Sequence, residues 1–569
     1  MTRLTNDPAD FPAEALKGFI AANKRYVKPV YGGVARSTFT PAGKVAVVYG
    51  GGSGHYPAFA GWVGHGFADG AVCGNIFSSP SAAQAYSVLK AVHRGAGVLM
   101  GFGNYAGDVL HFGQAIERLR AEGIEADTLV VTDDIASGDA AEPEKRRGIA
   151  GDFPVFKITS AAAEAGLGFD EVKRVFAKAN AATRSFGVAF AGCTLPGAKG
   201  PLFTVPAGRM GIGLGIHGEP GVAEADLGSA DDVARTLVEG LLADRPAGAG
   251  NRVVAIVNGL GASKYEELFV VTSCVVARLE AAGLECADVE AGEFVTSLDM
   301  AGVSLTLVWV DDELLGYWDA PCDAPAYRKG SVGSVERDDA KLSQAAAPVD
   351  VTTPGSTASR EAAEVAAGLL DDVAGMLARA QEELGALDSV AGDGDHGIGM
   401  ANGSRAAAGA AHAAVSAGGG LRTTLTAAGD AWSNRAGGTS GALWGALLTA
   451  LGSALGDEKT PDGDDIAAAL QAALSAVQRL GGAEVGDKTL VDALSPFVAA
   501  FVATDGDPGA LERARTAMVG AVGADLVAYP ISRHDIRAVQ ADATENQFAA
   551  LGYIGILIAA GVSTASLAV

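Results

Sequence analysis

The fold is indicated first by residues 44–57, Lys44-Val45-Ala46-Val47-Val48-Tyr49-Gly50-Gly51-Gly52-Ser53-Gly54-His55-Tyr56-Pro57. The beginning of this stretch is rich in β-branched side chains and runs directly into a glycine loop, which is the pattern of a buried strand and its turn. In α/β sheets, ligands bind at the loops that follow the carboxyl ends of the strands. The stretch therefore predicts an α/β fold with a candidate site residue, His55, on such a loop.

The same pattern repeats along the chain. Val98–Phe102 runs into the loop Gly103–Asp108, and Thr128–Thr132 runs into two further aspartates. Helical stretches at Ser81–Arg94 and Asp108–Glu122 lie between these strands. Strands that alternate with helices predict an α/β sheet.

The alternation resumes after about residue 200. We predict strands at residues 252–257 and 304–311 and a helix at residues 262–282. We therefore expect one α/β domain over residues 1–328, with two lobes at about residues 1–195 and 196–328.

A second histidine lies in Gly211-Ile212-Gly213-Leu214-Gly215-Ile216-His217-Gly218-Glu219-Pro220, among glycines and directly before an acid and a proline. An imidazole on such a loop can exchange a proton or attack a carbonyl carbon near neutral pH. Together with His55 and Asp108 it forms a candidate catalytic set: one histidine orients or protonates a substrate oxygen, the other binds the carbonyl, and the carboxylate serves as a base. The alternative is that Asp108 caps a helix and the histidines are structural.

Beyond residue 328 the pattern changes. Residues 329–357 are rich in small and polar residues and predict a linker. After Ser359, apolar residues recur at helical spacing. We predict an all-α domain over residues 358–569, with helical stretches at residues 359–384, 401–415, 441–455, 464–480, 491–503, 508–522 and 547–560.

Three aspartates gather in the helical domain, at Asp388, Asp393 and Asp395, on a glycine-rich loop. Carboxylates this close together repel one another unless cations neutralise them, and hard oxygen ligands suit Mg²⁺ or Ca²⁺. Mg²⁺ that is held by few carboxylates is usually also coordinated by phosphate oxygens, so we expect a nucleotide to supply the remaining ligands. The alternative is a solvated acidic turn.

Two further glycine loops in this domain, at residues 436–441 and 481–489, lie at the starts of predicted helices. The start of a helix offers backbone N–H groups to an anion. No Walker A motif is present, because Gly486-Asp487-Lys488-Thr489 lacks the upstream glycine spacing and the strand. Taken singly, these glycines are better explained by helix packing.

Composition limits the class of protein. The formal net charge of the 569 residues is -25, which argues against a general binder of nucleic acid or anionic membranes. The five cysteines form no C-x-x-C pair and predict buried thiols in a reducing compartment. The first ten residues are acidic without an apolar core, and no apolar run is long enough to span a bilayer. We expect a cytoplasmic protein.

Taken together, these motifs resemble those of single-chain, ATP-dependent dihydroxyacetone kinases, in which a ketone-binding domain is fused to an ATP-binding domain. The segments that carry the resemblance are Gly50–His55, Asn104–Asp108, Gly215–Pro220, Thr296–Met300, Trp318–Pro321, Asp388, Gly392–Gly397, Gly438–Gly441 and Gly486–Thr489.

The resemblance implies a set of roles. His217 would bind the ketone covalently as a hemiaminal, and His55 and Asp108 would hydrogen-bond the substrate and act as acid and base. The aspartates at 388, 393 and 395 would hold two Mg²⁺ on the ATP phosphates.

The implied substrate-binding residues are Gly52, Ser53, Gly54, His55, Tyr56, Gly103, Asp108 and His217. The implied ATP-binding residues are His396, Gly397, Gly399, Gly438, Thr439, Ser440, Gly441, Gly481, Gly486, Thr489 and Leu490. The second domain would be a barrel of helices, and a homodimer would place the ATP domain of one subunit over the ketone domain of the other.

The sequence departs from the family pattern in three places. Tyr56 replaces a common glutamate, and Gly103 replaces a common lysine. We expect both changes to border the ketone pocket and to favour a four-carbon ketose such as erythrulose over dihydroxyacetone. The usual nucleotide-clamping segment near the C-terminus is replaced by Gly523–Asn546, where Arg533 and Arg537 are the candidate substitutes for its arginine.

The expected function is transfer of the ATP γ-phosphate to a primary hydroxyl of a short ketose, with no role for nucleic acid or membranes. Two alternatives come from other classes. One is an FAD-AMP lyase that forms cyclic FMN, an activity of relatives of this family. The other is a non-catalytic protein that binds a ketone or fatty acid on a similar two-lobe fold, which would have no use for the three aspartates.

Overall fold

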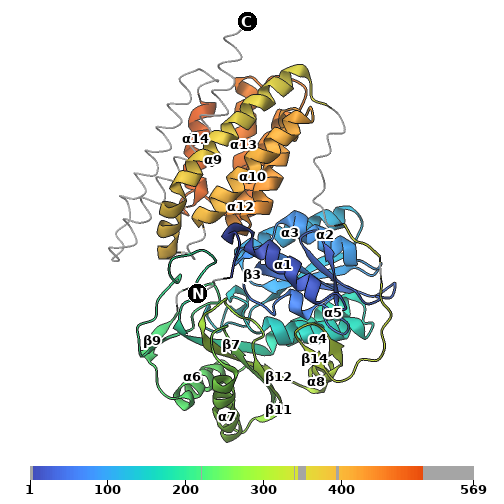
Figure 1. The fold of residues 1–569 in the computed structure, drawn as a ribbon, viewed down its shortest axis with the longest axis vertical. Coiled ribbons are helices and arrows are strands. Elements are labelled where there is room, and N and C mark those ends of the chain that lie inside the picture. The colour runs from blue at the N-terminus through green and yellow to red at the C-terminus, as the bar shows by residue number, and fades with distance from the viewer. Residues whose placement is uncertain are drawn as a thin grey trace. The chain divides into compact units, whose positions relative to one another are not determined.

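The computed structural model describes residues 4–219, 221–338, 340–343, 354–391, 396–487 and 489–503. The chain divides into two compact units, Met1–Ala346 and Ala347–Val569, and each is described by itself (Figure 1).

The first unit contains two six-stranded sheets. In the first sheet the strand order is β1-β2-β4-β3-β5-β6, and the strands from β4 to β6 are parallel. Parallel strands need crossover connections, and α2 supplies the one from β4 to β5 and α3 the one from β5 to β6. The strands are β1 (Val27–Val30), β2 (Gly33–Arg36), β3 (Ala46–Ser53), β4 (Gly70–Ile76), β5 (Val98–Gly103) and β6 (Ala126–Val131), and the helices are α1 (Phe11–Ala22), α2 (Ala82–Val92) and α3 (Ala106–Ala121).

The second sheet has the order β11-β10-β12-β7-β8-β9 and is mostly antiparallel, with β10 and β11 as its parallel pair. Its strands are β7 (Thr183–Ala191), β8 (Arg209–Ile212), β9 (Ala223–Asp226), β10 (Arg252–Gly259), β11 (Glu285–Gly292) and β12 (Ala301–Trp309). The remaining elements of the unit are α4 (Asp152–Glu164), α5 (Phe169–Ala181), α6 (Ala230–Ala243), α7 (Tyr265–Ala281), α8 (Asp312–Asp319), β13 (Cys322–Asp323) and β14 (Arg328–Lys329).

The predicted lobe boundary near residue 195 is corrected by this topology, because β7 already belongs to the second sheet. No local pattern marks the change, since β7 directly follows α5 as a strand of the first sheet would. The α/β fold class is confirmed.

The two sheets share one hydrophobic core. Alternate residues of β3 face opposite sides: Val47 and Tyr49 pack into the shared core, while Ala46 and Val48 pack against α2 and α3. The shared core also takes in α4, α5 and α8 and one face of β10 and β12. The other face of the second sheet is covered by α6 and α7. Figure 1 shows the resulting succession of helix and sheet layers.

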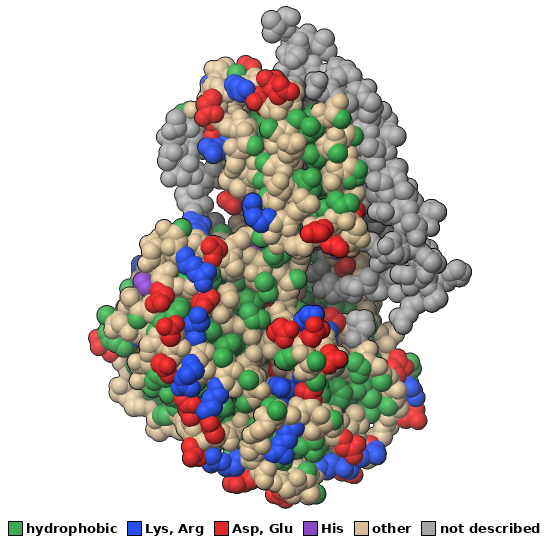
Figure 2. All heavy atoms as spheres, turned by 180° about the vertical axis from the view of Figure 1, so that it is seen from behind, with side chains coloured by type: hydrophobic (Ala, Val, Ile, Leu, Met, Phe, Trp, Pro, Cys, Tyr) green, Lys and Arg blue, Asp and Glu red, His purple; other side chains and the backbone are tan. Residues whose placement is uncertain are grey.

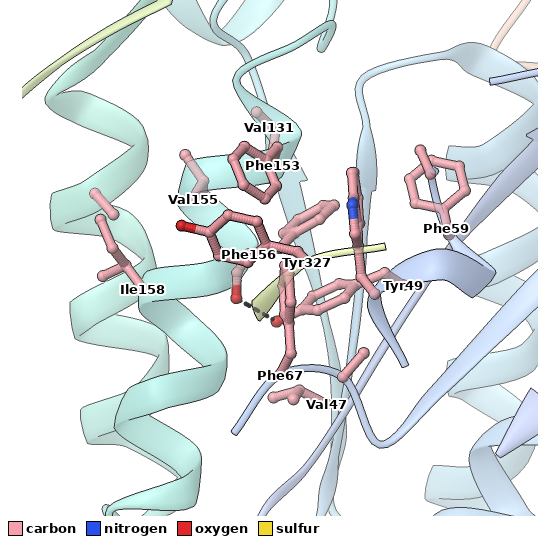
Figure 3. Close-up of a cluster of buried hydrophobic side chains, with 14 of the residues drawn as sticks. Val47, Tyr49, Phe59, Phe67, Val131, Phe153, Val155, Phe156, Ile158 and Tyr327 are labelled. Atoms are coloured by element: carbon pink, nitrogen blue, oxygen red, sulfur yellow. Dashed lines mark hydrogen bonds between the residues drawn. The ribbon is translucent and has the colours of Figure 1, made fainter. Parts of the chain in front are cut away.

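Aromatic rings fill the centre of the shared core (Figure 3). The ring of Tyr49 stacks on Phe156 with centroids 3.9 Å apart, and the Tyr49 hydroxyl donates to the carbonyl oxygen of Phe156 at 3.1 Å. A buried tyrosine needs such a partner for its hydroxyl. The core thereby fixes β3, whose carboxyl end leads into the candidate site.

The described part of the second unit consists of helices, which confirms the predicted class. They are α9 (Thr357–Ala391), α10 (His396–Ser416), α11 (Leu421–Ala436), α12 (Gly438–Leu455), α13 (Gly463–Gly481) and α14 (Leu490–Val502). They enclose a single core in which Trp432 stacks on Trp444. The helices predicted at residues 508–522 and 547–560 lie outside the described residues.

The surface of the first unit carries charges of both signs. Figure 2 shows Lys and Arg interspersed with Asp and Glu over one face of it. Among the helices described, none is long and apolar enough to cross a membrane.

Candidate active site

His55 lies on the glycine loop that follows β3. Gly54 has φ +102°, a backbone conformation that glycine adopts without strain. Two backbone hydrogen bonds join the loop to the connection between β11 and β12 of the second sheet: Leu298 N–H donates to the Gly54 carbonyl at 2.8 Å, and Thr296 N–H donates to the His55 carbonyl at 3.2 Å. These bonds set the direction of the imidazole.

The structure brings His55 and His217 into direct contact. Their Nε2 atoms lie 3.1 Å apart, and both residues are buried, with 3% and 9% exposure. The Nδ1 atom of His55 lies 2.8 Å from the carbonyl oxygen of Thr296. Since His55 follows β3 of the first sheet and His217 follows β8 of the second, the pair is assembled only when both sheets are in place.

Two aromatic rings enclose the pair. Phe77 stacks on His55 with centroids 5.0 Å apart and meets His217 edge-on at 5.3 Å. Tyr105 meets His217 edge-on at 4.7 Å. The sequence did not identify either ring as a site residue, because nothing in its local pattern shows that Phe77, which follows β4, turns back onto the loop after β3.

Phe77 also explains the glycines of the loop. A Cβ at Gly52 would lie 2.7 Å from the Phe77 carbonyl carbon, and one at Gly54 would lie 2.8 Å from the Phe77 ring. Between them, the Ser53 hydroxyl donates to the Gly74 carbonyl at 2.7 Å. Gly52, Ser53 and Gly54, which are predicted to bind substrate, thus lie beside the imidazole pair and allow the loop to approach Phe77 and Gly74 closely.

Asp108 lies in the first turn of α3 and is 6% exposed. Burial raises the pKa of its carboxyl to about 7, although a hydrogen bond from Ser79 and the nearby imidazole of His217 lower it. Its Oδ1 atom is buried and has no hydrogen-bond partner in the structure. A buried acceptor without a partner is costly and marks a place where a donor from a ligand would fit.

Tyr56 and Gly103 have surroundings that differ from those expected. Tyr56 is 52% exposed and its ring packs edge-on against Phe19 of α1. It lines an apolar cavity of about 490 Å³ whose lining includes Gly51–Gly54 and α1 but not the two histidines or Asp108. A Cβ at Gly103 would lie 2.9 Å from the Gly148 carbonyl oxygen. The space beside Gly103 is therefore occupied by backbone, and the glycine does not open room for a substrate.

In the second unit, three helices place predicted nucleotide-binding residues together. The His396 N–H, at the start of α10, donates to Asp388 Oδ2 of α9 at 3.3 Å. The His396 Nδ1 atom lies 3.2 Å from the Ser440 hydroxyl of α12. His396, Ser440 and Leu490 also line a small cavity of about 90 Å³, together with Leu377, Leu384, Met400, Leu443 and Trp444.

The glycines of this region lie at close helix contacts. A Cβ at Gly397 would lie 2.0 Å from the Gln381 carbonyl oxygen of α9, and one at Gly441 would lie 3.3 Å from Ala436. Gly399 is farther from its neighbours, with Ala436 O at 3.8 Å. The first turn of α12, which contains Gly438, Thr439 and Ser440, has no side-chain cap. The start of a helix is a place where backbone N–H groups can bind an anion.

The loop between α13 and α14 is held by an acid that the sequence did not identify. Asp492 accepts hydrogen bonds from the N–H groups of Gly486 and Thr489, at 2.5 and 2.7 Å. Thr489 in turn caps α14 through the N–H of Val491, and Gly481 ends α13. The N–H groups of Gly486 and Thr489 therefore make hydrogen bonds that hold the loop to α14.

Asp393 and Asp395 lie outside the described residues, as do Arg533 and Arg537. Within the described ranges, no three His, Cys, Asp or Glu side chains gather closely enough to hold a metal ion. Asp388 is the described member of the predicted set.

The sequence matches known proteins over most of its length. Residues 17–326 match the Dak1 domain and residues 390–526 match the DAK2 domain. A D-erythrulose kinase of Mycolicibacterium smegmatis is 56% identical over 501 residues, covering 87% of this chain and 86% of its own. An L-erythrulose 1-kinase of the same organism is 54% identical over 525 residues, covering 91% and 92%.

The chain belongs to the dihydroxyacetone kinase family. The enzyme is therefore a kinase with both family domains in one polypeptide. Its structure is similar to that of the C. freundii dihydroxyacetone kinase in complex with AMP-PNP and Mg²⁺, with a TM-score of 0.53 and 28% identity over 97% of this chain and 99% of the other.

Proposed function

We propose that this kinase transfers the γ-phosphate of ATP to a primary hydroxyl of a four-carbon ketose, erythrulose. The observation that carries the chemistry is the buried, partnerless Oδ1 of Asp108 in the site that holds the His55–His217 pair. The names of the two erythrulose kinases from Mycolicibacterium smegmatis, at 56% and 54% identity, support the substrate class.

In the proposed reaction His217 anchors the ketose through its carbonyl carbon, which selects ketones over polyols. Asp108 accepts the proton of the hydroxyl that is phosphorylated, a role that suits a carboxyl whose pKa of about 7 lies near the working pH. Phe77 and Tyr105 exclude water from the anchored carbon. The remaining site residues of this proposal, Gly52, Ser53 and Gly54, shape the loop that holds His55.

The donor set of the second unit fits a Mg²⁺–nucleotide complex. Asp388 presents a hard carboxylate oxygen, and the first turn of α12 has no side-chain cap. We propose that Asp388, Asp393 and Asp395 hold two Mg²⁺, and that His396, Ser440 and the turn at Gly438–Gly441 bind the phosphates. When bound, the metal ions neutralise charge on the transferring phosphoryl group.

Tyr56 and Gly103 do not account for a tetrulose preference. Tyr56 packs on α1 and Gly103 packs on Gly148, so neither residue supplies the extra room that the sequence suggested. We therefore base the preference on the two relatives.

The division of function at residues 1–328, 329–357 and 358–569 also remains part of this proposal. So do the cytoplasmic location and the homodimer in which one subunit's ATP domain covers the other's ketone domain.

A coupled ADP-release assay of the full chain tests the function. We expect kcat/KM for D- or L-erythrulose to exceed that for dihydroxyacetone by at least tenfold, about 1.4 kcal/mol of transition-state binding. FAD in place of a ketose tests the lyase alternative through the release of AMP and cyclic FMN. A tenfold preference for dihydroxyacetone would refute the tetrulose assignment, and no ADP release with any short ketose would refute the kinase reaction itself.

A further inference from the structure

Glu219 folds back over His217, which lies two residues before it. The His217 N–H donates to Glu219 Oε2 at 3.0 Å, and the His217 Nδ1 atom lies 3.0 Å from Glu219 Oε1. An ionised carboxylate only accepts hydrogen bonds, so the proton of this contact belongs to Nδ1 of His217. Burial raises the pKa of Glu219, but the charges of His217 and Arg147 outweigh burial and lower it to about 2, which keeps the carboxylate ionised.

The same reasoning fixes the proton of His55. Its Nδ1 atom faces the carbonyl oxygen of Thr296 at 2.8 Å, and a carbonyl can only accept. Both imidazoles thus carry a proton on Nδ1. If both were neutral, their Nε2 lone pairs would face each other across 3.1 Å, a repulsive arrangement. The contact is a hydrogen bond only if one further proton lies between the two Nε2 atoms.

The geometry assigns the extra proton to His217, because its ring faces the Glu219 carboxylate, whereas the ring of His55 faces a neutral carbonyl. Burial and the charge of His217 lower the pKa of His55 to about 3, so His55 is the neutral acceptor. The imidazolium of His217 is then balanced by Glu219. The other ionisable groups around this pair are Asp108, Tyr105, and Arg147 with its partner Asp134.

The position of the Glu219 carboxylate is itself built into the fold. Arg147 donates to Asp134 Oδ2 through two nitrogens, at 2.8 and 3.1 Å, and its third nitrogen lies 3.8 Å from Glu219 Oε2. A Cβ at Gly215 would lie 2.0 Å from Glu219 Oε2. The glycine at 215 is therefore required for the carboxylate to reach back over the loop.

We propose that Glu219 is a positioning residue that holds the proton on Nδ1 of His217, leaves Nε2 as the nucleophile, and makes the imidazole pair carry one stored proton. This inference rests on the proposed ketose function. On ketose binding, the Nε2 proton of His217 passes to Nε2 of His55. A bond then forms between His217 Nε2 and the carbonyl carbon, the C=O π bond breaks, and the oxygen takes the proton from His55. The substituted His217 ring remains a cation paired with Glu219, so charge and protons balance without another reactant.

The first experiment determines which ring nitrogens of His55 and His217 are protonated in the absence of substrate. The full chain contains eight histidines and is labelled with ¹⁵N at histidine, and the signals of the pair are assigned as those lost in H55A and H217A. At pH 7 we expect His217 to be protonated on both nitrogens and His55 on Nδ1 alone. Two neutral imidazoles in the wild-type chain would overturn the proposal, whatever the enzyme phosphorylates.

The second experiment uses Glu219→Gln, which keeps the shape and an acceptor but removes the charge. We expect His217 to lose its second proton at pH 7. We expect kcat/KM for the ketose to fall about 10- to 100-fold, by analogy with the loss of a carboxylate that orients a metal-bound histidine. We expect the loss to appear in KM for the ketose, with KM for ATP unchanged. Glu224→Gln, at an exposed acid on the neighbouring strand β9, is the matched control and should change neither value.

If the E219Q variant keeps the doubly protonated His217 and wild-type ketose kinetics, Glu219 has no such role. A wild-type chain with the expected proton count but without ketose kinase activity would instead contradict the proposed function. The two failures are therefore distinguishable.

Discussion

Asp108 combines two properties that usually exclude each other in a stable core. It is 6% exposed, and one of its carboxylate oxygens has no partner. Burial raises its pKa to about 7 from an ordinary value of about 4. When folding raises the pKa of an acid, the free energy of unfolding falls as the pH rises from the unfolded pKa to the folded pKa. The contribution of Asp108 to stability is therefore least favourable above about pH 7, where its carboxylate can act as a base.

Asp108→Asn should therefore lower kcat about 10²- to 10⁴-fold, the range for loss of a general base. Because the base must be ionised, kcat/KM of the wild-type enzyme should rise tenfold per pH unit below about pH 7 and level off above it. The variant should melt at a higher temperature at pH 8, since no charge is left to bury. Steady-state kinetics and thermal unfolding measure both effects. Asp170→Asn, at an exposed acid in the first turn of α5, is the control. Wild-type turnover in the D108N variant would remove Asp108 from the chemistry.

The three catalytic candidates could be predicted from sequence because each lies on or just after a glycine loop that follows a strand. Phe77, Tyr105 and Thr296 could not be predicted as their partners. Their contacts with the imidazoles depend on how separate strands are ordered in the two sheets, which local pattern does not specify. Tyr56 shows the converse: it is adjacent to His55 in sequence, but it packs on α1.

At the scale of elements, a buried ion cluster joins the first sheet to α4. Arg36 of β2 and Lys44, just before β3, contact both Asp69 and Glu164, at 2.6 to 3.2 Å. Burial raises the pKa of Glu164, but Lys44 and Arg36 outweigh burial and lower it to about 2. The carboxylate thus stabilises the fold fully above its unfolded pKa of about 4.3, and this contribution disappears as the pH falls toward 2.

Glu164→Gln should lower the free energy of unfolding by about 3 kcal/mol at pH 7, because it leaves two buried cations short of a partner. The difference from the wild type should shrink as the pH is lowered from 5 toward 2. Denaturant unfolding across this pH range measures it. Glu171→Gln removes an exposed ion pair with Arg174 and should change stability by less than about 0.5 kcal/mol. An equal, pH-independent loss in both variants would contradict the role of the cluster.

Two of the helices that the sequence did not predict, α4 and α11, show where periodicity fails. Residues of α4 are buried on nearly every side, so no polar face alternates with an apolar one. In α11 the buried face contains small and polar residues such as Thr424 and Gly429, and a Cβ at Gly429 would lie 2.7 Å from the Gly445 carbonyl oxygen of α12. Close helix crossings need small side chains, which contribute little to a hydrophobic pattern.

At the scale of the whole molecule, the two units carry separate parts of the proposed reaction. Asp393→Asn combined with Asp395→Asn should reduce turnover about a thousandfold or more, because the metal ions would lose their ligands. Binding of the ketose, measured by calorimetry without nucleotide, should be unchanged. His217→Ala is the reciprocal control: it should weaken ketose binding and leave nucleotide binding unchanged. ATP-dependent turnover that survives in the double variant would refute the metal site.

The order of the domains and their classes could be predicted because the period of the pattern changes along the chain, from strands alternating with helices to helices alone. The boundary between the two sheets could not, because β7 looks like any other strand that follows a helix. Its place is decided by pairing with β12, more than a hundred residues later in the chain.

The shared core of the two sheets has a consequence for how substrate enters. Many two-lobed binding proteins clamp their ligand by rotating one lobe about a hinge. Here such a rotation would open the shared core, to which β3 contributes Val47 and Tyr49 and β10 contributes Val254 and Ile256. Each Å² of apolar surface exposed in this way would cost about 25 cal/mol. The imidazole pair is consequently assembled before any ketose arrives. The loss of conformational freedom on binding falls on the small molecule, whose few torsions make that loss small.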